Sequence, residues 1–246
     1  MIGILLLLPL IPMAFFFVYL RKRRQIIQSV TSLTRGESSE RDLIYRLVRE
    51  GIPNHTIFHD IYVPTKSGYA QIDLVVPTRV GVFVFEVKDY SGWIFGNGRH
   101  EKWTQVLAYG QEKHQFYNPI RQNERHIEAL RQALPQLQHV PCFSIIVFYG
   151  SSSIRALSNV PFNCRVAYPK EAVDLITTAM QRLSPARYAD KWDIMNALKR
   201  FKANGDNPAI VAGHLRRARM AGYGKYRSTY AYAPRYMRGW RWLGRF

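Results

Sequence analysis

Two neighbouring apolar runs in the first half of the chain predict a pair of β-strands. Across residues 69–77 apolar side chains alternate with others, so Gln71 and Asp73 lie on one face of the first strand. The next run is rich in β-branched and aromatic residues and ends in Glu86 and Lys88, which are again two positions apart. A short connection between the runs predicts a hairpin that brings two acids and a lysine to one edge of a sheet.

The rest of the pattern predicts a mixed α/β domain around this hairpin. Apolar residues at helical spacing, continuous apolar runs and Gly-rich breaks mark the other elements. A turn or hairpin is expected at residues 91–98. We expect helices at residues 25–33, 38–50, 117–134, 170–182 and 188–202, and further strands at 56–63, 142–149 and 165–168.

The acids of the predicted hairpin suit phosphodiester hydrolysis. Mg²⁺ is a hard ion that takes carboxylate and carbonyl oxygens, so Asp73, Glu86 and the Val87 carbonyl are candidate ligands, with Mn²⁺ as an alternative ion. Lys88 is placed to orient a water or to stabilise developing negative charge. The spacing alone leaves a second interpretation open, in which Glu86 and Lys88 are only charged residues where a strand leaves the core.

Several ordered motifs around this cluster resemble those of one family. From about Gly36 to Asn123 the chain is similar to a NERD domain, a nuclease-related domain of the PD-(D/E)xK restriction-endonuclease-like superfamily. The matching pieces are Ser39-Glu40-x-x-Leu43-x-x-x-Leu47, Ala70-Gln71-Ile72-Asp73, Gly81-Val82-Phe83-Val84-Phe85-Glu86-Val87-Lys88-Asp89-Tyr90-x-Gly92, Trp103 and Asn118-Pro119-x-x-Gln122. The resemblance implies a restriction-endonuclease-like mixed β-sheet flanked by helices.

The resemblance also assigns roles to individual residues. It implies that Asp73 and Glu86 are metal ligands and Lys88 the catalytic lysine. It places Gln71 beside them, Glu40 on the first helix facing the metal, and Gln122 on a later helix lining the site.

One position departs from the family pattern. The family has Gly before the first-helix Glu, and this chain has Ser39. Ser39 is expected to cap the helix, with Glu40 near the positive helix end. Gly36-Glu37 is a competing alignment.

The first twenty residues predict a membrane anchor. Residues 1–20 carry no charged side chain, and about 20 apolar residues are enough to cross a bilayer as a helix. Arg21-Lys22-Arg23-Arg24 follows, which predicts an outside N-terminus and a cytoplasmic domain. A cleaved signal peptide is the rival, but it would carry positive charge before the apolar run and small residues at a cleavage site.

The formal net charge of +18 is concentrated toward the two ends. Residues 214–246 are rich in Arg and aromatic residues and contain no acid. Arginine neutralises phosphates and aromatic faces stack bases, so this tail is a candidate nucleic-acid surface. Adsorption to anionic lipid and a solvated disordered tail are the two other interpretations. The candidate binding residues are Arg216, Arg217, Arg219, Lys225, Arg227, Arg235, Arg238, Trp240, Arg241 and Trp242.

The chain thus divides into five expected segments. They are a transmembrane anchor at 1–20, a basic juxtamembrane segment at 21–35, the nuclease-like domain at 36–183, a helical segment at 184–213 and the basic aromatic tail at 214–246. Two cysteines are too few for a disulfide framework. The leading hypothesis is a membrane-anchored, Mg²⁺-dependent nuclease acting on DNA, with RNA as the alternative substrate. The alternative is a noncatalytic, membrane-tethered scaffold that binds nucleic acid or protein.

Overall fold

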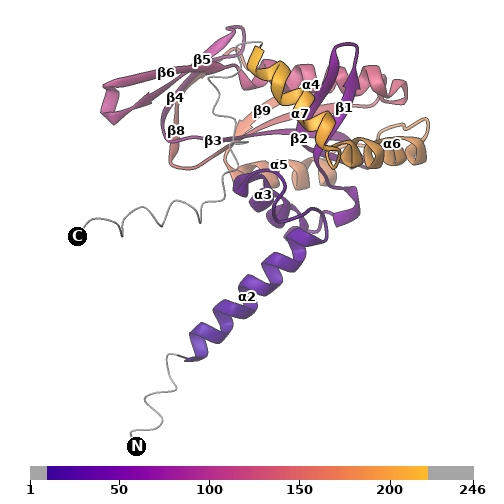
Figure 1. The fold of residues 1–246 in the computed structure, drawn as a ribbon, viewed down its shortest axis with the longest axis horizontal. Helices are drawn as coiled ribbons and strands as arrows, with labels where there is room; N and C mark the ends of the chain where they lie inside the picture. The colour runs from indigo at the N-terminus through magenta and orange to yellow at the C-terminus, as the bar shows by residue number, and fades with distance from the viewer. Residues whose placement is uncertain (1–9, 221–246) are drawn as a thin grey trace, which may run out of the picture.

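The structure is a computed structural model that describes residues 10–220; residues 1–9 and 221–246 lie outside the described part (Figure 1). Two mixed β-sheets form its centre, with strand orders β1-β2-β3-β7-β9 and β6-β5-β4-β8. The strands of the larger sheet are β1 (Phe58–Thr65), β2 (Gly68–Thr78), β3 (Gly81–Asp89), β7 (Cys142–Tyr149) and β9 (Cys164–Ala167). Those of the smaller sheet are β4 (Gly92–Asn97), β5 (Lys102–Leu107), β6 (Glu112–Tyr117) and β8 (Ser152–Ser158).

The predicted hairpin is confirmed. Strands β2 and β3 pair antiparallel, and a tight turn joins Thr78 to Gly81. On its other side β3 pairs parallel with β7. β3 therefore lies in the middle of the sheet, which explains its continuous apolar run, because side chains on both of its faces are buried.

Helices cover both faces of the larger sheet. Alternate residues of β3 point to opposite sides, so Val82 and Val84 join one core cluster while Phe83 and Phe85 join another. The first cluster packs under α4 (Pro119–Ala133) and α6 (Lys191–Asn204), and the second under α3 (Ser38–Arg49) and α5 (Pro169–Arg182). The predicted mixed α/β architecture flanked by helices is confirmed.

A third cluster joins the two sheets. Trp103 of β5 stacks on Phe148 of β7, with ring centroids 6.2 Å apart and planes 4° apart. Asn118, which caps α4, donates its side-chain amide to the carbonyls of Asn97, Gly98 and His100. The smaller sheet and the start of α4 are thereby held in one arrangement.

The N-terminal helix α2 (Leu10–Gln28) projects from the side of the domain that carries α3 (Figure 1). It continues across the predicted membrane boundary at residues 20 and 21, and it ends at Gln28 rather than at residue 33. Among residues 10–220 no helix is long and apolar enough to cross a membrane. The first nine residues of the predicted anchor lie outside the described part, so the anchor stays a prediction.

The last described helix, α7 (Pro208–Met220), contacts β2 and runs across the expected segment boundary at residue 214. His214 Nδ1 lies 2.9 Å from the Tyr69 carbonyl oxygen, and because a carbonyl only accepts, this ring nitrogen is the donor. The predicted tail therefore begins inside a helix that packs on the domain. Its residues from 221 onward lie outside the described part.

Candidate functional site

The three residues of the predicted cluster come together at one end of β3. Backbone pairing between β2 and β3 stops at Leu74 and Phe85. Beyond that point the Asp73 carboxylate replaces the ladder, because its Oδ2 accepts the Val87 N–H at 2.8 Å. Lys88 Nζ forms an ion pair with Glu86 Oε1 at 2.6 Å. The predicted convergence of Asp73, Glu86 and Lys88 is therefore what the structure shows.

Helix α4 adds two side chains to this cluster. Gln122 Oε1 accepts a hydrogen bond from Lys88 Nζ at 3.1 Å. Gln122 therefore lies beside the cluster, where it was predicted. His126 Nε2 lies 3.1 Å from Glu86 Oε2. These residues are four apart on one helix, so they share the face that looks at the end of β3.

Asn123 holds α4 in this position. Its side-chain amide donates to the Val84 carbonyl at 2.8 Å and to Ser144 Oγ at 2.9 Å. Asn123 is completely buried, so these bonds connect α4 to β3 and β7 inside the core. The sequence did not predict the role of Asn123. The four-residue spacing from Gln122 places His126 near the Gln122 face, where contact with phosphate was the expectation, but its contact with Glu86 was not predicted.

Gln71 connects the site to a second carboxylate. Its Nε2 lies 3.2 Å from Asp73 Oδ1 and 3.1 Å from Asp60 Oδ1. Asp60, on β1, forms an ion pair with Arg35, whose Nε lies 3.0 Å from Asp60 Oδ2. The shared face predicted for Gln71 and Asp73 is confirmed, and the Asp60–Arg35 pair behind it was not anticipated.

Glu40 lies at the start of α3 on the side of Asp73. Its Oε2 is 2.8 Å from His59 Nε2, and His59 Nδ1 is 2.8 Å from Thr31 Oγ1. All three residues are buried. Glu40 is therefore held by its own hydrogen-bonded chain, and it acts on the site through its charge.

The expected Ser39 cap is wrong. Glu37 occupies the N-cap position of α3 and makes no side-chain capping bond. The Ser39 hydroxyl is buried without a hydrogen-bond partner. The helix begins two residues earlier than a Ser39 cap requires, so Ser39 lies inside the first turn. Its hydroxyl is buried in the domain rather than placed at the free N–H groups of the helix end.

Of the two carboxyl groups at the end of the hairpin, Asp73 has the less stable anion and Glu86 the more stable one. Burial, and then the charges of Glu86 and Glu40, raise the pKa of Asp73 well above its ordinary value, although Lys88 opposes them. Burial also acts to raise the pKa of Glu86, but Lys88 and His126 outweigh it and lower that pKa. Burial acts to lower the pKa of Lys88, but Glu86 and other nearby groups raise it above its ordinary value. Lys88 is therefore a cation at neutral pH.

The site is compact and largely covered. The side chain of Lys88 is 11% exposed and that of Glu86 is 2% exposed. Within residues 10–220, no group of three or more His, Cys, Asp or Glu side chains is arranged to hold a metal ion. A divalent ion here would rest on Asp73 and Glu86 together with a carbonyl and waters.

Comparison with known proteins agrees with this geometry. Residues 35–149 match the family model described as NERD, nuclease-related domain. An uncharacterized protein of Bacillus anthracis is 33% identical over 126 residues, which cover 50% of this chain and 57% of that protein. The chain thus spans little more than half the length of this relative. No solved structure matches the chain.

Proposed function

We propose that the protein is a metal-dependent nuclease that hydrolyses phosphodiester bonds of DNA, with RNA as the alternative substrate, because residues 35–149 match the model of the nuclease-related domain. The observation that carries the proposal is the convergence of Asp73, Glu86 and Lys88 at the end of β3, with Gln122 and His126 against them. The high net positive charge of the chain suits a polyanionic substrate.

The donor set fits Mg²⁺ or Mn²⁺. Mg²⁺ is commonly bound through one or two carboxylates while it keeps several waters, and Asp73 and Glu86 supply two. Burial and then the charge of Glu86 raise the pKa of Asp73, and a cation between the two acids would relieve their repulsion. The N–H and C=O of one residue point to the same side of an extended strand, so the Val87 carbonyl faces the side of Asp73. Such an ion polarises a phosphate and acidifies a bound water.

The protein's own residues supply the remaining functions. Lys88 has three N–H donors, of which Glu86 and Gln122 take two, and the third is the candidate donor to the attacking water or to a phosphate oxygen. A lysine that stays charged cannot accept the proton of the water, so its role is to orient and to stabilise negative charge. Gln122 and His126 fix Lys88 and Glu86 and act as positioning residues.

Cleavage by the full-length protein tests this function. The purified chain should nick or degrade DNA with Mg²⁺ or Mn²⁺, and Asp73→Ala and Lys88→Ala should each lower the rate by about 10²–10³-fold or more. Lys102→Ala, which removes an exposed lysine of β5, is the matched control and should cleave at the wild-type rate. Equal cleavage by wild type and the two site variants would defeat the assignment.

A noncatalytic scaffold is the second candidate. The near-complete burial of Glu86 and the absence, among the described residues, of a three-residue metal group favour it. A scaffold would bind nucleic acid or protein in the presence of a chelator. It would not cleave nucleic acid with any metal ion.

We also propose the N-terminal helix as a single-pass membrane anchor with the domain on the cytoplasmic side. The exposed apolar side chains along α2 and the basic residues after them support this arrangement. The exposed group is Met13, Phe15, Phe16, Phe17, Val18, Tyr19 and Leu20. Resistance of the full-length protein to alkaline extraction from membranes is expected, and its release into the supernatant would contradict the anchor.

A further inference from the structure

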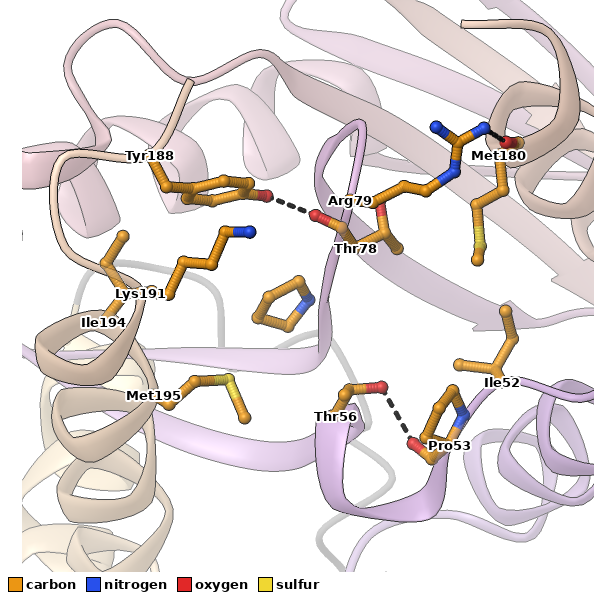
Figure 2. A pocket seen from close by; sticks show the side chains of 11 residues that line it. Ile52, Pro53, Thr56, Thr78, Arg79, Met180, Tyr188, Lys191, Ile194 and Met195 are labelled. Atoms are coloured by element: carbon orange, nitrogen blue, oxygen red, sulfur yellow. Dashed lines mark hydrogen bonds between the residues drawn. The ribbon is translucent and has the colours of Figure 1, made fainter. Parts of the chain in front are cut away.

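A cavity of about 360 Å³ opens at the end of the larger sheet opposite the candidate site, beside the turn between β2 and β3. Its size falls within the roughly 300–1,000 Å³ of small-molecule sites. Figure 2 shows Met180 and Met195 facing the cavity from two sides, with Ile52 and Pro53 at the lower right.

The cavity is lined mostly by apolar groups and by two basic residues, of which Lys191 lies over the Tyr188 ring and Arg79 donates to the Met180 carbonyl. The polar groups nearest to it are already paired, since Tyr188 donates to the Thr78 carbonyl and Thr56 to the Pro53 carbonyl. Arg79 and Lys191 are its two charged lining residues, and both are cations. The chemistry of the lining therefore favours a ligand that consists of an apolar chain with an anionic group at one end.

Exposed apolar side chains continue beside the opening. Leu183, three residues after Met180, is 43% exposed, and Trp192, next to Lys191, is 73% exposed. Trp favours the headgroup region of a bilayer, and Lys and Arg are attracted to anionic lipid. This combination is typical of a surface that meets a membrane.

The course of α2 places this surface on the side from which the N-terminal helix leaves. Tyr19 packs against Tyr45, with centroids 6.3 Å apart, and Arg23 pairs with Asp42 at 2.9 Å. The two helices therefore run antiparallel, so the direction toward the N-terminus of α2 is the direction toward the C-terminal end of α3. Ile52 of the cavity follows shortly after that end.

We propose that this cavity binds an acyl chain of an anionic bilayer lipid, with the lipid headgroup held by Lys191 and Arg79. The bound lipid holds the domain against the membrane at the end remote from Asp73 and Lys88. This inference rests on the proposed membrane anchor and not on nuclease activity. Loss of vesicle association would overturn both the anchor and the lipid site, whereas association without crosslinks in the cavity would overturn the lipid site alone.

Photocrosslinking of the full-length protein in vesicles tests it. The vesicles contain phosphatidylcholine with phosphatidylglycerol that carries a photoreactive acyl chain, and crosslinked residues are mapped by mass spectrometry. Crosslinks are expected at Met180, Ile194 and Met195. Met195→Trp, which fills the cavity, should reduce them at least tenfold while the protein keeps its melting temperature.

Charge variants separate the headgroup contact from the chain contact. Lys191→Gln should lower crosslinking in the cavity several-fold. Arg200→Gln, which removes an exposed positive charge of the same helix outside the lining, is the control and should leave crosslinking unchanged. The proposal is overturned if wild-type crosslinks are absent from the cavity, if Met195→Trp does not reduce them, if Lys191→Gln and Arg200→Gln behave alike, or if the full-length protein does not associate with the vesicles. Since no readout uses cleavage, its failure is distinguishable from failure of the nuclease assignment.

Discussion

Glu37 is half-buried beside the site, where burial, and then the charges of Glu40 and Asp89, raise its pKa to about 7 although Arg41 opposes them. A carboxyl group with a raised folded-state pKa stabilises the fold below its unfolded value of 4.5, and this stabilisation is lost as the pH rises from 4.5 through 7. Glu37→Gln should therefore flatten the pH dependence of unfolding over this window. At pH 8 the variant should be more stable by about 1 kcal/mol, a value reduced for solvent screening.

Denaturant unfolding at several pH values measures this effect. Glu50→Gln removes an exposed glutamate at the other end of α3 and is the matched control. A Glu37→Gln protein with the same pH profile as wild type would show that the Glu37 carboxyl is not perturbed.

The buried Glu40–His59 pair gives a second expectation. His59→Phe removes the partner 2.8 Å from Glu40 Oε2 and leaves a carboxyl group that is 5% exposed without it. The loss should be about 3 kcal/mol of unfolding free energy, measured by chemical denaturation. Adding Glu40→Leu should recover part of this loss, because removal of both polar partners costs less than removal of one. No recovery in the double variant would contradict the pairing as the cause.

The residue types of the site could be predicted from the sequence. Many of the side chains that hold the site residues in place could not. Asp73, Glu86 and Lys88 are close in sequence and lie on strands whose register follows from a short turn. His59 meets Glu40 through the packing of β1 against α3, and Arg35 reaches Asp60 across 25 positions. Contacts of this kind depend on how elements pack, and the pattern along the chain does not contain that information.

Among the elements, the larger sheet could be predicted and most of the smaller sheet could not. Strands such as β7 are continuous apolar runs because both of their faces are covered. Strand β6 exposes its first four residues, and β8 is exposed or half-buried throughout. Their sequences therefore carry little apolar signal, and no strand was predicted at either position.

Asn118 should contribute more to the free energy of unfolding than an ordinary helix cap does. It caps α4 through the Ile120 N–H and also donates to three carbonyls at the end of β4 and in the turn between β4 and β5. Asn118→Ala should cost roughly 2–3 kcal/mol, against about 1 kcal/mol for Asp190→Ala, which removes the exposed cap of α6. Equal losses in denaturant unfolding would mean that the bonds to the smaller sheet contribute little.

Across the whole molecule, the excess of positive charge predicts salt-dependent binding of DNA. Arg216, Arg217 and Arg219 lie on α7, which contacts β2, the strand that carries Gln71 and Asp73. Replacing all three by Gln in an Asp73→Ala background should weaken binding and reduce the slope of log affinity against log salt by up to about 2.7, or roughly 0.9 for each phosphate that is no longer neutralised. Fluorescence anisotropy at several salt concentrations measures the slope.

The control for this experiment removes the same charge elsewhere. Arg182, Arg187 and Lys199 are exposed basic residues on or near α5 and α6. Their replacement by Gln should change the slope less than the α7 substitutions do. Equal changes would show that binding follows net charge rather than the position of α7. The predicted binding residues from Lys225 onward lie outside the described part.

The loop before α3 contains a glycine with a further consequence for engineering. Gly36 has φ +62°, and a Cβ built there would lie 2.3 Å from Glu40 Oε2 and 2.4 Å from His59 Nε2. Every other amino acid carries that atom and also disfavours the backbone angle. Saturation mutagenesis of this codon, followed by selection for folded protein, should return glycine almost alone, and directed evolution of the protein would do well to leave the position untouched.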